Sequence, residues 1–522
     1  MKWILCILCG VAMCIPSEHA LHMFQQNRYE TGRYKGWMKE SVQDLIPSNV
    51  LPLGMVLAGL LAGIFHFPVF VFMLILVLMS GYSVAMEKGK TYIKPLVYTG
   101  RVKRQIAVLV LLSIVCMVGI LAFSRGSFGY ALLCAFAWFG PWVLIFPVGW
   151  ITTPIEKAVQ KSYLNDAKRI LNDHAGLIKI GITGSYGKTT TKNIMQAMLS
   201  EQYNSLMTPA SFNTPMGITR TIREMLKPIH EVFVCEMGAD HVGDISELMQ
   251  FVHPSIGVVT SIGPQHLNTF GSQENIVHEK MRMIEELPSD GLGILNYDNA
   301  FIRNYKVQNS VKVVSYGIDS EDVDYRAVNI HYTKTGSSFT VVTEEESVEL
   351  ETKLLGKLNI LNILSAVACA RHLGVSWEVI KRACKTMKQV EHRLELKKIN
   401  GYRFIDDAFN ANPSGSAMAL EVLSRMPGKR IIVTPGMIDL GSKQNEINHR
   451  FGTLMKGCAD IVVLVGETQT KPIYEGLQEV GFPMDNVLVV SKVKEAFQYV
   501  WNNATPEDTI LLENDLPDAF NH

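Results

Sequence analysis

The sequence predicts an α-helical membrane region followed by two α/β domains, the first of them carrying a phosphate-binding loop. Long uncharged apolar stretches fill the first third of the chain. A glycine-rich loop then separates an apolar strand from a helical pattern, and short strands alternate with helices to the end. We expect a membrane region of four to five helices at 1–165, a central phosphate-binding α/β domain at 166–392 and a doubly wound C-terminal domain at 393–522.

Charge divides the chain into two parts. Among its 522 residues Lys+Arg and Asp+Glu number 49 each, so there is no basic excess of the kind that nucleic-acid binders carry. A hydrophobic content of 48% excludes wholesale disorder. Residues 1–151 contain 12 basic and 5 acidic residues, which leaves 37 and 44 for the rest. The nine cysteines have no regular spacing and indicate neither a disulfide framework nor a zinc site.

Two uncharged stretches, 106–123 and 129–151, are each long enough to cross a bilayer. The first contains twelve Leu, Ile, Val or Phe residues, which contribute roughly −4 to −7 kcal/mol to insertion. Residues 51–86 are also uncharged but too long for one ~30 Å span. We interpret them as two short helices that turn near Pro68, with one tilted, kinked helix as the alternative. The apolar run 3–15 is interpreted as an uncleaved anchor.

The connection 87–104, between the uncharged stretches 51–86 and 106–123, is strongly basic. Its basic residues are Lys88, Lys90, Lys94, Arg101, Lys103 and Arg104. The positive-inside rule therefore places it in the cytoplasm. The last two spans form a hairpin around Arg125 and return the chain to the same side near Thr152. We accordingly expect a multi-pass protein of the plasma membrane with cytoplasmic catalytic domains.

The phosphate-binding loop follows an expected strand at 177–183. It reads Gly-Ser-Tyr-Gly-Lys-Thr-Thr-Thr from Gly184 and runs into a helical pattern. Backbone N–H groups at such a helix start face phosphates, while Lys188 neutralises charge and the Thr189 hydroxyl reaches magnesium. The strict phosphate-loop spacing is not met, because Ile182 occupies the first glycine position.

Polar residues also follow the next two expected strands. Glu236 comes directly after 232–235, and His266 follows 257–260. Open parallel sheets bind ligands beyond the carboxyl ends of their strands, so both side chains point to a magnesium site at the phosphates. Taken singly, Glu236 could cap a helix and His266 could be an ordinary loop histidine.

The order of these motifs resembles the Mur ligase superfamily, the ATP-dependent amide ligases that assemble the peptidoglycan stem peptide. The branch it most resembles adds D-alanyl-D-alanine, and the resemblance spans about 175–520. The motifs start at Ile182, Phe212, Glu236, Thr260, Phe270, Asn296, Gly356, His392, Asp406 and Gly436.

The resemblance implies that the protein binds ATP and two Mg²⁺ ions. It also implies that a substrate carboxylate is activated as an acyl phosphate, which an amine then attacks. The implied catalytic residues are Lys188, Glu236, His266 and Lys280. The implied nucleotide-binding residues are Gly184, Ser185, Gly187, Lys188, Thr189, Thr190, Asn296, Arg393 and Asp407, the last two acting once the domains close. The implied metal ligands are Thr189, Glu236, His266 and Lys280 if carbamylated, and the implied substrate contacts are Asn213, Asn410 and Asn412. The alternative for Lys280 is an ordinary solvated lysine.

The chain departs from the family pattern where substrate recognition is concerned. Leu358 stands where the family has a histidine, and Ser416 comes one residue later than is typical. The C-terminal segment lacks the usual Gly-Ser-Arg. Membrane spans replace the soluble domain that grips the UDP-sugar. We therefore take a lipid-linked acceptor as a hypothesis.

The leading functional interpretation is a membrane-anchored ligase that joins an amino acid or dipeptide to a carboxylate-bearing peptidoglycan-type precursor. One alternative is a polyglutamate-type ligase acting on a polymer or folate, or another amide ligase on a lipid-linked or polymer acceptor. A membrane P-loop ATPase, working as a transporter or regulator, is the alternative from another class. The remaining segments fit an α/β chain: 325–355 predicts a hairpin, 359–388 is helical, and five further strands begin near 402.

Overall fold

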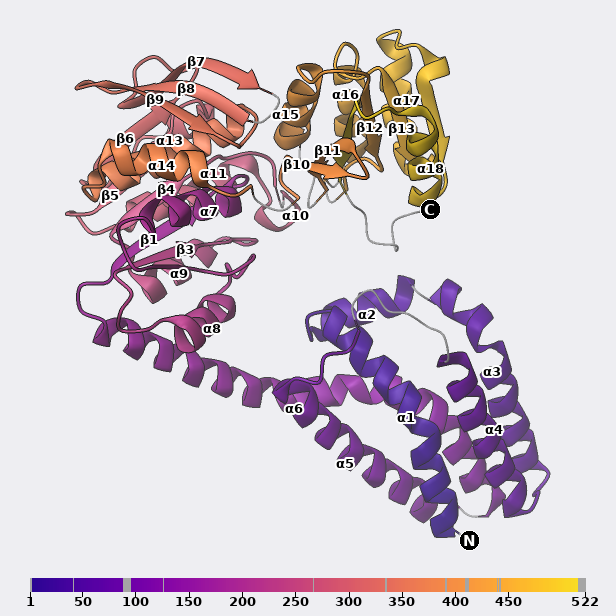
Figure 1. Ribbon diagram of the computed structural model, residues 1–522. Helices are drawn as coiled ribbons and strands as arrows, with labels where there is room; N and C mark the ends of the chain where they lie inside the picture. Colours follow the sequence, from indigo (N-terminus) through magenta and orange to yellow (C-terminus); the bar gives the residue numbers. More distant parts are fainter. Residues whose placement is uncertain are drawn as a thin grey trace. The chain divides into compact units, whose positions relative to one another are not determined.

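The computed structural model describes residues 2–40, 42–87, 95–124, 126–265, 267–333, 336–389, 392–408, 413–438, 440 and 443–514. These residues form two compact units, Met1–Tyr163 and Leu164–His522, each of which is described by itself (Figure 1). The division of the second unit into 166–392 and 393–522 stays a prediction at this level.

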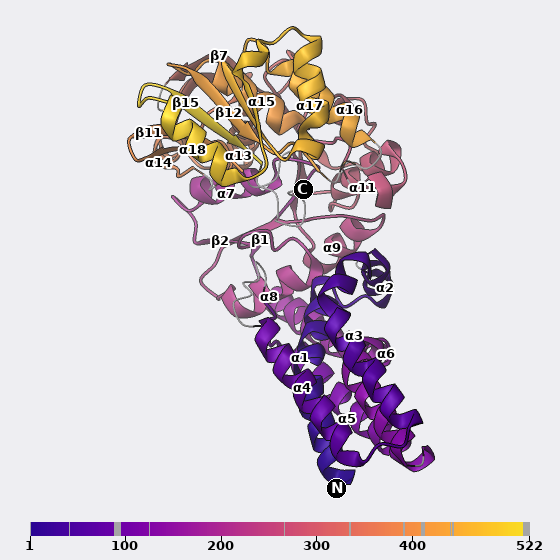
Figure 2. The same cartoon turned by 90° about the vertical axis from the view of Figure 1, so that its right-hand side faces the viewer.

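The first unit is helical. Its helices are α1 (Lys2–Gln26), α2 (Thr31–Glu40), α3 (Val42–Ile64), α4 (Val69–Glu87), α5 (Gly100–Phe123) and α6 (Ser127–Asp173), the last of which continues past Tyr163 into the second unit. Within the described part of the chain, α1, α4, α5 and α6 are long and apolar enough to cross a membrane, and α3 contributes the shorter apolar stretch Val50–Ile64. Figure 2 shows α1, α3 and α4 running alongside one another.

The predicted two-helix interpretation of 51–86 is confirmed, because α3 ends at Ile64 and α4 begins at Val69. Two other helices, α1 and α6, are longer than predicted. Helix α1 continues well past residue 15, and α6 continues past 151 to Asp173. Polar side chains such as Gln and Lys are good helix formers, so a helix need not end where its apolar run ends.

Apolar side chains cover both faces of the bundle helices. On α5, Leu109 and Met117 are buried, whereas Leu111 and Val115 are 61% and 59% exposed. A water-facing helix would place polar residues on its exposed face. The pattern is typical of a helix surrounded by hydrocarbon.

The second unit contains a nine-stranded sheet in the order β2-β3-β1-β4-β5-β6-β7-β8-β9. Its strands are β1 (Ile178–Thr183), β2 (Ser205–Met207), β3 (Val232–Glu236), β4 (Ile256–Val259), β5 (Leu292–Asn296), β6 (Lys312–Gly317), β7 (Tyr325–Thr333), β8 (Gly336–Val342) and β9 (Ser347–Thr352). The first seven are parallel, and β7, β8 and β9 pair antiparallel. The hairpin expected at 325–355 is thus present.

Helices cover both faces of this sheet, which is why β3, β4 and β5 are buried along their whole length. One face packs against α7 (Lys188–Leu199), α13 (Lys357–His372) and α14 (Trp377–Thr386). The other packs against α8 (Pro215–Met225), α9 (Asp244–Val252), α11 (Gln273–Glu285) and α12 (Ala300–Arg303). The short α10 (Leu267–Phe270) precedes α11. The carboxyl ends of the central parallel strands therefore form one open edge.

A six-stranded sheet follows, in the order β10-β11-β15-β12-β13-β14. Its strands are β10 (Glu395–Ile399), β11 (Tyr402–Asp407), β12 (Arg430–Thr434), β13 (Ile461–Val465), β14 (Val487–Val490) and β15 (Thr509–Glu513). Helices α15 (Pro413–Ser424), α16 (Gln444–Leu454) and α17 (Glu467–Glu479) cover one face and α18 (Val493–Asn503) the other. The predicted fold class, a nucleotide-binding α/β domain plus a doubly wound α/β domain after an apolar helical region, is confirmed.

Candidate active site

The loop Gly184–Gly187 joins the end of β1 to the start of α7. Gly184 has φ +148°, and a Cβ there would lie 2.2 Å from Thr260 Oγ1, so only glycine fits. The hydroxyls of Thr260 and Ser261 donate to the Tyr186 carbonyl, at 2.5 and 2.9 Å. These contacts fix the loop against the segment that follows β4.

The first turn of α7 leaves donors for a ligand. The first helical hydrogen bond runs from Thr191 N–H to the Gly187 carbonyl, so the preceding N–H groups have no partner within the helix. Lys188 Nζ donates to the carbonyls of Gly184 and Ser185, at 2.6 and 3.2 Å. Burial lowers the pKa of this lysine. An ammonium group and a helix start thus converge where a phosphate would bind.

Glu236 lies at the end of β3, facing the loop. Its Oε1 accepts from Thr189 Oγ1 at 3.2 Å and from Asn213 Nδ2 at 3.0 Å. Its Oε2 lies 3.0 Å from Lys192 Nζ, but no described donor makes a hydrogen bond to it. The structure therefore brings Thr189, Glu236 and Asn213 together. The helix-cap alternative for Glu236 is not what the structure has.

This arrangement fits a magnesium ion. A buried carboxylate oxygen without a hydrogen bond, beside a threonine hydroxyl and a phosphate-binding loop, is the oxygen donor set that Mg²⁺ takes up together with phosphates. Lys192 Nζ, 3.0 Å from the second oxygen, places an opposite charge beside this buried carboxylate.

Lys280 lies on α11 and is only 2% exposed, which is against the solvated-lysine alternative. Its Nζ donates to the Ala239 carbonyl at 3.2 Å. Burial, reinforced by the nearby positive charge of Lys188, lowers the pKa of Lys280 to about 7. A large fraction of the amine is thus neutral at neutral pH, as reaction with CO₂ to a carbamate requires.

The structure describes only some of the other predicted site residues. His266, Asn410 and Asn412 lie outside the described residues. Asn296 is buried at the end of β5, where its amide donates to the Thr260 carbonyl at 2.8 Å and accepts from Asp298 N–H at 3.0 Å. Its side chain ties two loops of the site together, and its contact with adenine stays a prediction.

Arg393 and Asp407 from the C-terminal domain lie in one cleft with Gly187 and Thr190. The other residues lining it are Tyr186, Leu358, Asn359, Asn362, Leu394, Gly415 and Met418. Arg393 and Asp407 thus adjoin the phosphate loop in this structure, and their contact with the nucleotide on domain closure stays a prediction. The cleft has a volume of about 60 Å³, well below the ~300 Å³ of small ligand pockets.

Burial raises the pKa of Asp407 to about 6. Behind it, Glu513 is fully buried and accepts from Ser416 Oγ at 2.6 Å. The desolvated site and the Asp407 carboxylate together raise the pKa of Glu513 well above its usual range. Ser416, one residue late against the family pattern, thus serves this buried acid.

Sequence reasoning missed two buried charged residues. Lys192 pairs with Glu236, and Glu279 accepts from the N–H groups of Gly243 and Ile245, at 2.8 and 2.7 Å, at the start of α9. Lysine and glutamate inside amphipathic helices usually face water, so neither position carried a signal.

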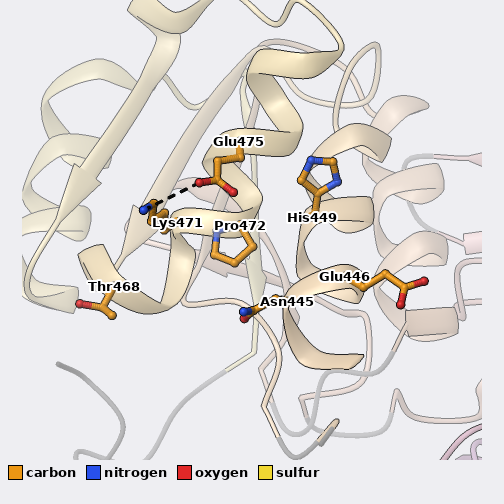
Figure 3. A pocket seen from close by; sticks show the side chains of 7 residues that line it. All are labelled: Asn445, Glu446, His449, Thr468, Lys471, Pro472 and Glu475. Atoms are coloured by element: carbon orange, nitrogen blue, oxygen red, sulfur yellow. Dashed lines mark ion pairs between the residues drawn. The ribbon is translucent and has the colours of Figure 1, made fainter. Parts of the chain in front are cut away.

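A second cavity, of about 410 Å³, lies between α16 and α17 (Figure 3). Its lining is Asn445, Glu446, His449, Thr468, Lys471, Pro472 and Glu475. The two helices touch closely at Gly476, where a Cβ would lie 2.2 Å from the His449 carbonyl oxygen. Lys471 Nζ lies 4.0 Å from Glu475. No predicted site residue lines this cavity.

Comparison with known proteins decides the family. Residues 182–370 match the family described as the Mur ligase middle domain, and residues 392–513 match the family described as the Mur ligase, glutamate ligase domain. The chain belongs to the Mur ligase family. As such it is an ATP-dependent, ADP-forming acid–amino-acid ligase.

Its curated relatives within the Mur ligases include the UDP-N-acetylmuramoyl-tripeptide–D-alanyl-D-alanine ligases of Escherichia coli and Bacillus subtilis. Both are 30% identical, over 61% and 64% of this chain and 72% of each relative. The crystal structure of MurF from Acinetobacter baumannii superposes with a TM-score of 0.62 at 26% identity, covering 68% of this chain and 77% of that one.

Proposed function

We propose that this Mur ligase is anchored in the plasma membrane and adds D-alanyl-D-alanine to a peptidoglycan precursor in the cytoplasm, through an acyl-phosphate intermediate. The observation that carries the proposal is the convergence of Lys188, Thr189 and Glu236 at the end of β1 and β3. The relatives with this activity share the two ligase domains.

The residues divide the work of binding. Lys188 and the first-turn amides of α7 bind the phosphates of ATP. Thr189 and Glu236 would hold one Mg²⁺ and His266 would serve a second, with carbamylated Lys280 as a metal-facing anion. When bound, Mg²⁺ neutralises charge on the phosphates and so favours attack by an anion.

The reaction depends on positioning the substrates and neutralising charge rather than on a protein nucleophile. A carboxylate oxygen of the acceptor attacks the γ-phosphorus, and the bond to ADP breaks. The amine attacks the resulting carbonyl carbon, loses a proton, and the tetrahedral intermediate expels phosphate as the amide forms. The Lys188 amine lies beside the phosphate site, and as an ammonium it stabilises the negative charge that develops on the transferred group.

Membrane anchoring rests on the helices α1, α4, α5 and α6 and on their exposed apolar faces. Because these helices precede the ligase domains where a soluble UDP-sugar domain would be expected, we infer a lipid-linked acceptor. The basic connection before α5 favours a cytoplasmic site, where ATP is available.

The test is ADP release by the full chain in detergent, with a muramoyl-tripeptide acceptor and candidate amines. We expect release with D-alanyl-D-alanine, none with glutamate, and none without an acceptor carboxylate. Lys188→Met should lower turnover at least ~10²-fold, whereas the exposed Lys227→Met should not. Turnover with glutamate would favour the polyglutamate-type alternative, and acceptor-independent hydrolysis would favour a membrane ATPase.

The acceptor itself is tested by comparing a soluble UDP-muramoyl tripeptide with a lipid-linked muramoyl tripeptide in nanodiscs. We expect the lipid-linked form to have the higher kcat/KM. Full efficiency with the soluble form would contradict a lipid-linked acceptor and leave the ligase chemistry intact.

A further inference from the structure

Polar side chains are buried at one end of the helical bundle, where α1, α5 and α6 meet. On α5, Gln105 lies one turn before the buried Leu109. On α6, Thr152 lies one turn after the buried Val148. A further turn along α6 lies Glu156, which is 5% exposed. The apolar core of this junction therefore changes into a polar layer near the start of α5.

Gln105 has no partner in this layer. Its side chain is fully buried, yet neither amide atom makes a hydrogen bond in the structure, and Arg101 Nε, one turn earlier on α5, is also buried without one. Each buried, unsatisfied polar group costs ~1–3 kcal/mol. Polar side chains within membrane helices are commonly kept for a ligand or transport pathway.

The charges at this end leave Arg101 available. Arg104 and Glu156 form a two-pronged ion pair, at 2.6 and 2.7 Å, so the one buried acid of the layer is already neutralised. Within the described ranges no carboxylate forms an ion pair with Arg101. Glu156 also faces Arg101 electrostatically, but one carboxylate against the two guanidinium groups of Arg101 and Arg104 leaves this layer with an excess positive charge.

The guanidinium of Arg101 is held in place by Tyr29, in the turn that follows α1. Its Cζ lies 3.9 Å from the centre of the Tyr29 ring, which supports the cation by its π face. Tyr29 sits in a turn where Arg28 and Tyr29 have φ of +56° and +61°, a conformation that costs non-glycine residues energy. Gln25 fixes this turn by donating to the Tyr29 hydroxyl at 2.8 Å.

We propose that this junction binds the phosphate of an anionic lipid headgroup. The Arg101 guanidinium pairs with phosphate oxygens, and the Gln105 amide supplies a further donor. A lipid is the fitting carrier, because the outer face of α5 directly beyond the site is apolar: Val110, Leu111 and Ile114 are about half exposed or more. The inference rests on the membrane anchoring in the proposed function, and not on its ligase chemistry.

The experiment measures binding of dioleoyl phosphatidic acid to the full chain in phosphatidylcholine nanodiscs. We expect Arg101→Gln and Gln105→Leu each to weaken binding at least ~10-fold. Lys103→Gln removes the same charge from an exposed position on the same turn of α5 and should bind like the wild type. Inorganic phosphate, added to nanodiscs without phosphatidic acid, should not bind measurably.

Stability separates a ligand site from a structural one. Gln105→Leu removes an amide without partners, so without phosphatidic acid its thermal midpoint should equal or exceed that of the wild type. Unchanged lipid binding in both site variants, or equal weakening by Lys103→Gln, would overturn the proposal. So would tight binding of free phosphate, which would point to a soluble ligand. None of these results bears on ADP release, so the ligase proposal is tested separately.

Discussion

The buried Glu236 carboxylate accepts hydrogen bonds from a hydroxyl and an amide and forms an ion pair with an ammonium group. Thr189 and Asn213 take one oxygen, and Lys192 lies beside the other. The oxygen beside Lys192 is the one that has no hydrogen bond. The ion pair with Lys192 therefore positions a carboxylate oxygen of Glu236 at the phosphate loop, where it can bind a metal ion.

Glu236→Gln removes the negative charge and leaves the Lys192 ammonium buried without a counter-charge. We expect a loss of ~3–5 kcal/mol in the unfolding free energy of the domain, together with loss of ligase activity. The double variant Glu236→Gln/Lys192→Met should regain most of the stability in chemical denaturation but none of the activity. Recovered activity in the double variant would show that Glu236 acts only structurally.

Lys280 gives a pH-dependent stability. Its pKa of about 7 in the fold lies below that of the unfolded chain, so between pH 7 and ~10 the unfolded state holds a proton that the native state has released. Stability therefore rises with pH across this window. In CO₂-free buffer, Lys280→Met should be more stable than the wild type at pH 6, and this advantage should shrink by pH 9. A constant difference in thermal midpoint would contradict the lowered pKa.

The glycine loop is the element on which nucleotide binding depends. Gly184→Ala places a Cβ 2.2 Å from Thr260 Oγ1, so we expect the loop to shift and the KM for ATP to rise at least ~10-fold. Gly176→Ala is the matched control, since Gly176 also has a positive φ but open space around it. Equal effects of the two substitutions on KM would assign the loss to backbone strain rather than to loop position.

Elements with strong local signals could be predicted from the sequence. The strand, glycine loop and helix around Lys188, the hairpin at 325–355 and the turn at Pro68 all follow from local patterns. Strand β10 was not predicted, because Glu395, Lys397 and Lys398 make it polar and its pairing with β11 is a tertiary contact. Lys192 and Glu279 also gave no signal, since only tertiary contacts bury them.

At the scale of the whole molecule, the proposed membrane anchoring makes the orientation of the chain decide whether the site meets ATP. The basic connection before α5 predicts that the ligase domains lie in the cytoplasm. In intact spheroplasts they should resist added protease, and in inverted vesicles they should be cleaved. Digestion in intact spheroplasts would contradict the predicted orientation.

The most direct test of the chemistry follows the oxygen atoms. With an ¹⁸O-labelled acceptor carboxylate, D-alanyl-D-alanine and ATP, the acyl-phosphate route transfers one carboxylate oxygen to the released phosphate. We predict phosphate carrying one ¹⁸O atom per amide formed, as measured by mass spectrometry. Unlabelled phosphate accompanying full amide formation would contradict the account.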